Sequence, residues 1–276
     1  MKNFNADLNV VLDAIRKALP RISRDFYEVE KLQISKKGVT DFVTNTDLKT
    51  EKTLVTHLQK ARADYGFLTE ESGELPSLNG TKNLGFEYRW VIDPIDGTFN
   101  FMHGIPFFCI SVALVKIENN KTSVLLGVIC NPSNNEIFYA GRNMGAHLID
   151  HLGTHRKMRI PHHKDFERVV CAVHDNPHPT GRLNEYIDYV QKKHCRTRIF
   201  GASALEMAYL ADGRINLLIQ GKLNVWDYAA GLLIIREAGG VVRDLNGKDF
   251  EFNVDSGIMA GNQDMIEEIE KGYKNV

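Results

Sequence analysis

The chain has 276 residues, of which 43% are hydrophobic and 25% charged, and its formal net charge is −1. These values are ordinary for a globular enzyme with one large or two smaller hydrophobic cores. They indicate no strongly basic face, so nucleic acid is excluded as the main partner. No apolar segment approaches the roughly 18 residues that a membrane span needs, so we expect a soluble protein without a membrane partner.

The cysteines and the first residues indicate the compartment. None of the four cysteines, at positions 109, 130, 171 and 195, belongs to a Cys-x-x-Cys pair, and three lie within or beside apolar runs. This placement is typical of reduced core cysteines. Residues 1–5 contain no apolar signal region. We therefore expect a cytoplasmic protein.

The first 61 residues predict helices separated by a strand and a turn. Residues 5–19 place apolar side chains on one helical face, and Pro20 should kink or end this helix, although a helical spacing resumes after it. A strand is expected over residues 32–37. The polar turn 41–47 should place Asp47 at the N-terminus of the next helix, where capping by itself explains the carboxylate.

Acidic residues follow the next two apolar strands. Residues 66–69 lead to Glu70, residues 75–88 are expected to form an exposed loop, and residues 90–92 lead into Asp93-Pro-Ile-Asp-Gly-Thr98. This second stretch predicts a sharp turn, with Thr98 capping a short helix. Two carboxylates, a hydroxyl and a helix N-terminus would then lie together, which suggests phosphate held through metal ions. The alternative is that Asp-Pro and Asp-Gly only form a turn.

The remaining elements change character near the middle of the chain. Apolar runs at 107–115, 124–130, 136–140 and 146–150, joined by turn signals, predict an antiparallel meander. Strands over 169–173, 198–200, 216–219, 241–242 and 258–260 then alternate with helices over 183–193, 203–211, 227–238 and 264–271. The polar segment 153–164 between these parts marks a boundary. We expect an α+β part over residues 1–155 and an α/β part over residues 156–276.

Several histidines lie close to that boundary. His147, His151 and His155 are spaced by four, but the segment predicts a strand and a turn, so this spacing does not place them on one face. Together with His162 and His163 they are interpreted as solvated residues and not as zinc ligands.

Four acidic residues share a local context. Glu70, Asp93, Asp96 and Asp227 each lie at a strand end or a helix start, and Asp227 could simply cap the helix that follows it. If they converge, four negative charges meet without an arginine, and cations are needed to stabilise them. Oxygen ligands favour Mg²⁺ first and Mn²⁺ second.

The motifs in the chain carry a family resemblance. Asp41-Phe-Val-Thr-Asn-Thr-Asp47, Glu70-Glu71-Ser72, Asp93-Pro-Ile-Asp-Gly-Thr-Phe-Asn-Phe101, Trp226-Asp-Tyr-Ala-Ala-Gly231 and Glu237-Ala-Gly-Gly240 occur in order. In this order and spacing they closely resemble the inositol monophosphatase family over nearly the whole chain. The resemblance implies a layered αβαβα sandwich and Mg²⁺-dependent hydrolysis of phosphomonoesters. It also implies a homodimer and inhibition by Li⁺.

The resemblance also assigns the site residues. Glu70, Asp93 and the Ile95 carbonyl would hold one metal, Asp93, Asp96 and Asp227 a second, and Glu70 a weaker third. The amides of Gly97 and Thr98 would bind phosphate. The Thr98 hydroxyl, paired with Asp47, would orient the attacking water, so Asp47, Glu70 and Thr98 are the implied catalytic residues.

The residues that would contact the substrate depart in one place from the family pattern. Gln220 stands where many members carry a glutamate that bonds inositol hydroxyls, and Ser203 and Ala204 match the other polyol-contacting turn. A helix cap at Ser203 is the structural alternative. The expected substrate is myo-inositol 1-phosphate. Alternatives are histidinol phosphate, fructose 1,6-bisphosphate or a nucleotide phosphate, or a non-enzymatic role as a partner of the transcription machinery.

Overall fold

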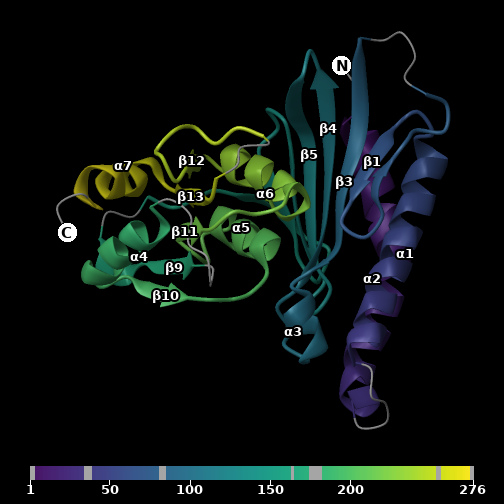
Figure 1. Ribbon diagram of the computed structural model, residues 1–276, viewed down its shortest axis with the longest axis horizontal. Helices are drawn as coiled ribbons and strands as arrows, with labels where there is room; N and C mark the ends of the chain where they lie inside the picture. The colour runs from purple at the N-terminus through teal and green to yellow at the C-terminus, as the bar shows by residue number, and fades with distance from the viewer. Residues whose placement is uncertain are drawn as a thin grey trace.

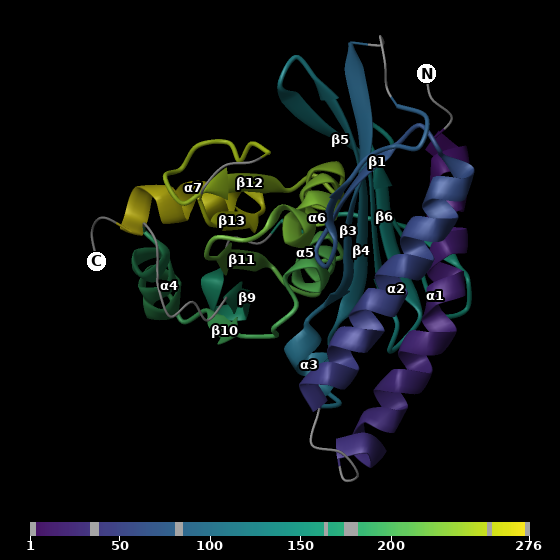
Figure 2. The ribbon, with the colours of Figure 1, turned by 45° about the vertical axis from the view of Figure 1, so that its right-hand side comes forward.

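The computed structural model describes residues 4–33, 39–80, 85–162, 165–173, 182–252 and 256–273. In these residues the chain forms five layers that alternate between helices and sheets (Figures 1 and 2). The outermost layer on one side is a pair of long helices, α1 (Phe4–Gln33) and α2 (Val39–Ala61). None of the helices in the described part of the chain has the length and hydropathy to cross a lipid bilayer.

The first sheet has eight strands in the order β2-β1-β3-β4-β5-β6-β7-β8. Their bounds are β1 (Gly66–Thr69), β2 (Gly73–Leu75), β3 (Phe86–Asp96), β4 (Cys109–Glu118), β5 (Lys121–Asn131), β6 (Glu136–Gly141), β7 (Ala146–Ile149) and β8 (His155–Met158). β1 and β3 are parallel, whereas β3 to β8 pair antiparallel in chain order, and β4 to β7 form the predicted meander. The short helix α3 (Thr98–Met102) follows β3.

The second sheet has five strands in the order β10-β9-β11-β13-β12. The bounds in this part are η1 (Phe166–Arg168), β9 (Val170–Val173), α4 (Leu183–Lys192), β10 (Arg196–Arg198), α5 (Ser203–Ala211), β11 (Leu217–Gln220), α6 (Val225–Glu237), β12 (Val241–Asp244), β13 (Ile258–Gly261) and α7 (Gln263–Gly272). β10, β9 and β11 are parallel, and the last two strands pair antiparallel. The predicted alternation of strands and helices is therefore confirmed.

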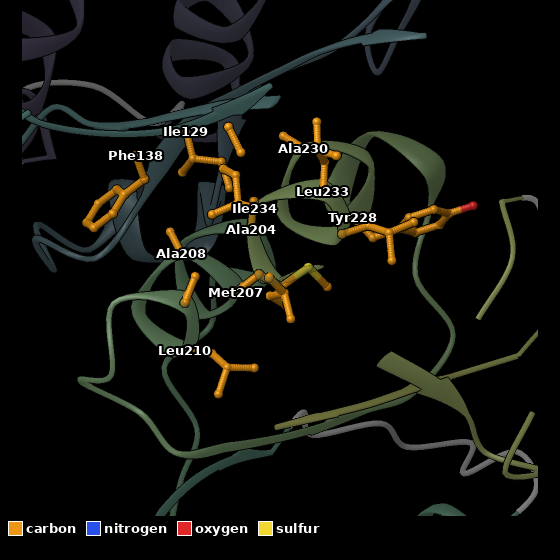
Figure 3. Packing of buried hydrophobic residues seen from close by; sticks show 14 of the residues in the cluster. Ile129, Phe138, Ala204, Met207, Ala208, Leu210, Tyr228, Ala230, Leu233 and Ile234 are labelled. Carbon is orange, nitrogen blue, oxygen red and sulfur yellow. The ribbon is translucent and has the colours of Figure 1, made fainter. Parts of the chain in front are cut away.

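Three hydrophobic cores hold the layers together. α1 and α2 pack on one face of the first sheet, where Ile15, Leu54 and Trp90 belong to a single cluster. α5 and α6 lie between the two sheets, and Figure 3 shows Ile129 and Phe138 of the first sheet near Ala208 and Ile234 of these helices. α4 and α7 cover the outer face of the second sheet. The expected αβαβα sandwich is confirmed, and the four cysteines are buried and free.

The boundary expected between residues 155 and 156 falls inside β8, an edge strand of the first sheet. Pairing of β8 with β7 continues to Met158.

The helical region at the start of the chain differs from the prediction. α1 contains Pro20 and continues to Gln33, because Ile22 and Phe26 after the proline are buried. Burial of two such side chains, about 1.5–3 kcal/mol each, offsets the roughly 3 kcal/mol cost of a proline inside a helix. A strand was expected over residues 32–37, but residues 32 and 33 belong to α1. The remainder of that segment lies outside the described residues.

Asp47 does not stand at a helix start, because α2 begins at Val39 and already contains the expected turn 41–47. Thr46, Asp47, Thr50 and Glu51 are buried in the interior of this helix. Polar residues that suggested a turn are therefore helical because tertiary burial overrides local preference.

The segment around β3 also differs from the prediction. β2 and the first residues of β3 occupy both ends of the loop expected over residues 75–88. β3 continues through Asp96 with a register shift between Asp93 and Asp96, so the expected sharp turn at this point is a bulged strand end.

Two short strands further along the chain also differ from the prediction. The strand expected over residues 198–200 lies at Arg196–Arg198, and β8 was not predicted.

Candidate active site

The parallel pairing of β1 and β3 brings acidic residues from two strands to one edge of the first sheet. Thr69 lies opposite Ile92, so Glu70 and Asp93 follow at the same strand ends. The backbone N–H of Glu70 donates to the Ile92 carbonyl at 3.1 Å. The Asp93 carboxyl lies close to the Glu70 and Asp227 side chains, whose charges act on it. The charge of Asp96 also acts on Asp93, so the structure brings together all four acidic residues singled out in the sequence.

Asp227 reaches this edge from the first turn of α6. Its carboxylate accepts a hydrogen bond from the backbone N–H of Asn224 at 2.8 Å. Asn224, and not Asp227, is the N-cap residue of α6. Asp227 thus closes the start of the helix with one oxygen and faces Asp93 from the other side of the site.

Burial and repulsion between neighbouring carboxylates raise the pKa values of the acidic residues in this cluster. Burial raises the pKa of Asp93 well above its usual range, and the charges of Asp96, Glu70 and Asp227 raise it further. Burial also raises the pKa of Glu70, and it raises the pKa of Asp227 to about 6. Because raised pKa values favour the protonated form, this cluster carries less negative charge than its composition suggests.

Asp96 connects β3 to the start of α5. Its Oδ1 accepts the backbone N–H of Ser203 at 3.2 Å, and its Oδ2 accepts that of Ala204 at 2.7 Å. The Cys109 thiol lies 3.6 Å from Oδ2 and donates to it. Burial, followed by the charge of Asp227, raises the pKa of Asp96 to about 8. The two amide donors place the Asp96 carboxyl at the N-terminus of α5, where free backbone N–H groups favour an anion.

The turn after Asp96 presents backbone amides beside the acidic cluster. Gly97 is the N-cap residue of α3 with φ at 89°, a left-handed conformation that glycine adopts without strain. The side chain of Asp93 accepts the Ile95 N–H at 3.0 Å, and the Thr98 hydroxyl donates to the Ile95 carbonyl at 3.0 Å. α3 begins at Thr98, so the N-cap position that was predicted for Thr98 is occupied by Gly97.

Asp47 and Glu51 approach the cluster from one face of α2. Glu51 accepts the backbone N–H of Glu71 at 3.0 Å and the Ser72 hydroxyl. Asp47 Oδ1 is buried without a hydrogen-bond partner. Burial, with the charges of Glu71, Glu70 and Glu51, raises the pKa of Asp47 to about 8. An unpaired buried oxygen next to this site is costly unless a ligand satisfies it.

Comparison with known proteins identifies the family. The model of the inositol monophosphatase family matches residues 5–273. The chain belongs to the inositol monophosphatase family. The inositol-1-monophosphatase of Caulobacter vibrioides is 36% identical over 262 residues, which cover 94% of this chain and 97% of that protein.

Other members of the family carry a different name. The Escherichia coli K12 protein called Nus factor SuhB is 35% identical over 262 residues, covering 94% of this chain and 92% of that protein. The crystal structure of the extragenic suppressor protein suhB from Bartonella henselae superposes with a TM-score of 0.80 at 37% identity, covering 98% of each chain.

The residues of this family member fit a hard divalent cation by their chemistry. Among the described residues, no three His, Cys, Asp or Glu side chains already stand as ligands around one point. The charges of Glu70 and Asp227 nevertheless act on Asp93, so the three carboxyl groups lie near one another. All available donors are oxygens, as Mg²⁺ and Mn²⁺ prefer, and the orphaned Asp47 oxygen lies beside them.

The residues expected to bind substrate do not all lie at the same place in the structure. Gly97 and Thr98 lie at the amide-lined turn, and Ser203 and Ala204 use their backbone N–H groups to hold Asp96. Ala202, and not Ser203, is the N-cap residue of α5. Gln220 is completely buried at the end of β11, where its amide donates to Glu206. In this structure the Gln220 side chain therefore lies in the protein interior and is not exposed to solvent.

Sequence reasoning missed four residues that support the site. Glu51 and Glu206 are acids that contact it from helices, Asn100 bridges two loops, and Cys109 donates to Asp96. For Glu51 a signal existed, since it lies four residues after Asp47 on a helical face. The other three gave no signal, because their partners are distant in sequence.

Proposed function

We propose that this protein is a phosphomonoesterase that depends on a divalent cation and acts on myo-inositol 1-phosphate. The observation that carries the proposal is the contact of Asp93 with Glu70 and Asp227 beside the amides of Gly97 and Thr98. Relatives named inositol-1-monophosphatase, at 36–38% identity, support the reaction class and the substrate.

The acidic residues would hold the cations. Glu70, Asp93 and the Ile95 carbonyl are assigned to one ion, and Asp93, Asp96 and Asp227 to a second, with a weaker third beside Glu70. Mg²⁺ or Mn²⁺ bound there supplies positive charge for the attacking and leaving oxygens of phosphoryl transfer.

The chain itself orients the substrate and the water. The amides at the start of α3, where Gly97 has a left-handed conformation, would bind the phosphoryl oxygens. Asp47 is assigned as the acceptor for the attacking water, because its Oδ1 has no other partner. Thr98 would orient the same water once its hydroxyl turns from the Ile95 carbonyl.

A phosphate-release assay with purified protein tests the proposal. Substrates are myo-inositol 1-phosphate, histidinol phosphate, fructose 1,6-bisphosphate and a nucleoside monophosphate, each with Mg²⁺, with Mn²⁺ and after chelation. We expect release that requires the cation, is inhibited by Li⁺ and is fastest with the inositol ester. Faster turnover of another ester would reassign the substrate, and turnover that survives chelation would refute the metal assignment.

A second candidate function follows from the relatives named Nus factor SuhB, at 34–35% identity. A role in the transcription machinery would not require hydrolysis. The variant Asp93→Asn separates the two functions in cells that lack the native protein. Rescue of any phenotype of these cells by this inactive variant would favour the second function, and failure to rescue would favour catalysis.

A further inference from the structure

Gln220 forms a buried pair with an acid that the proposed reaction does not use. Its Nε2 donates to Oε2 of Glu206 at 2.5 Å, from the end of β11 to the first turn of α5. Both residues are shielded from solvent, at 0% and 2% exposure. Gln220 Oε1 has no partner, so the amide is oriented by Glu206 alone. A contact between Gln220 and a solvent-borne substrate would require this buried pair to break.

Glu206 in turn holds the turn that precedes α5. Its other carboxylate oxygen accepts the backbone N–H of Gly201 at 3.1 Å. On the opposite side of this turn, Asn100 Nδ2 donates to the carbonyls of Phe200 and Phe107, each at 2.7 Å. The turn is therefore fixed between α3 of the first half of the chain and Glu206 of the second half.

This turn contacts two residues of the candidate active site. Ser203 and Ala204, directly after it, bind the Asp96 carboxylate through their amides. A Cβ atom built on Gly97 would lie 2.9 Å from Ala202 Cβ and 3.2 Å from the Gly201 carbonyl. The position of the turn thus sets where Asp96 and the Gly97 amide lie.

We propose that Gln220 and Glu206 form a buried positioning pair that fixes residues 200–204 against Asp96 and Gly97, and that Gln220 does not contact substrate. The consequence for turnover rests on the proposed function, whereas the structural coupling does not. The pair is specific in chemistry, because a buried carboxylate needs a donor and an amide supplies one without adding a second charge.

Exchange of the two residues tests the pair. In Gln220→Glu, two buried carboxyl groups face each other, and repulsion should move the turn. We expect the melting temperature of the metal-free protein to fall by about 5 °C at pH 8. Mg²⁺ affinity, measured by calorimetry without substrate, should weaken about tenfold, the usual scale for a residue behind a metal ligand.

The double variant Glu206→Gln/Gln220→Glu restores one amide and one carboxylate at the same place. The amide introduced at position 206 can accept the Gly201 N–H and donate to the carboxylate introduced at position 220. Melting temperature and Mg²⁺ affinity should therefore return close to those of the native protein. Glu206→Gln alone should have a small effect, because the Gln220 amide can rotate and offer its unused oxygen.

A matched control is Gln263→Glu on the exposed face of α7. Gln263 donates to Glu267 at the same 2.5 Å distance, but in contact with solvent. Water screens the added charge there, so this control should change neither the melting temperature nor the Mg²⁺ affinity.

The outcomes are distinct. Equal effects of Gln220→Glu in the native and Glu206→Gln backgrounds would show that the residues are not coupled and would overturn the proposal. So would a change in KM for the ester, at saturating Mg²⁺, that is the same in the single and the double variant, because this indicates contact with substrate. If no ester is hydrolysed, the stability and metal measurements still decide the coupling, and only the proposed function fails.

Discussion

The carboxyl groups of Asp93 and Glu70 lie next to each other at the ends of two parallel, neighbouring strands, where the charge of Glu70 raises the pKa of Asp93. Burial and the charges of Asp96 and Asp227 raise this pKa as well, so Asp93 binds a proton more readily than an exposed aspartate. The negative charge of this cluster should therefore increase as the carboxyl groups ionise at higher pH. Protons and divalent cations should therefore compete for this site, which can be measured.

The first prediction concerns the stability of the metal-free protein. Burial raises the pKa of Asp47 and Asp96 to about 8 and that of Asp227 to about 6, whereas aspartates in the unfolded chain have a pKa of about 4. Between these values the folded state binds more protons than the unfolded state, so stability should fall as pH rises. We expect a melting temperature at least about 5 °C lower at pH 8.5 than at pH 6. Mg²⁺ should remove most of the difference, and equal melting temperatures without metal would contradict the prediction.

The second prediction concerns Asp93→Asn. Asparagine keeps the shape but cannot supply a bridging carboxylate, so divalent-cation binding should be lost. Phosphate release should fall by about three orders of magnitude, as expected when several kcal/mol of charge stabilisation disappear. Calorimetry with Mg²⁺ and the phosphate assay measure these effects. Asp188→Asn, an exposed carboxylate on α4, is the control that should leave both unchanged, and an Asp93 variant with native activity would exclude the bridging role.

The third prediction separates activity from stability at Asp47. Asp47→Asn removes a buried charge that is repelled by Glu71, Glu70 and Glu51. The metal-free protein should therefore melt a few degrees higher at pH 8.5. Turnover should fall about 10²–10⁴-fold with cation affinity retained, as expected for loss of a proton acceptor.

A comparison variant on the same helix face checks this interpretation. Glu51→Gln weakens the acceptor of the Glu71 N–H and the Ser72 hydroxyl, so it should lower the melting temperature instead. If Asp47→Asn is fully active, Asp47 has only a structural role.

The fourth prediction concerns the close contacts of Gly97. Gly97→Ala combines a φ of 89° with a Cβ only 2.9 Å from Ala202 Cβ, so the backbone must shift. We expect phosphate release to fall at least about tenfold while the fold is retained. Gly153→Ala is the matched control, because Gly153 has φ of 81° but no atom within 4 Å of the added Cβ. Equal activities of the two variants would remove the argument that close packing positions this turn.

Much of the fold could be predicted from local patterns in the sequence. The meander from β4 to β7 and the alternation of strands and helices after Val170 follow from apolar periodicity and turn residues. The errors fall where tertiary burial compensates for an unfavourable local sequence. α1 continues through Pro20, and the polar segment around Asp47 is helical, because both helices pack on the first sheet.

For the candidate site, too, local sequence signals predicted some features and tertiary contacts decided the others. The sequence by itself determined that Glu70, Asp93, Asp96 and Asp227 lie at strand ends or helix starts, since turn residues and apolar runs are local signals. Only the tertiary structure decided that they meet, that Asp47 faces them from the interior of α2, and that Gln220 is turned inward to Glu206. These relationships join residues far apart in the chain, and their energy comes from burial and charge, which depend on distances in space and not on spacing in sequence.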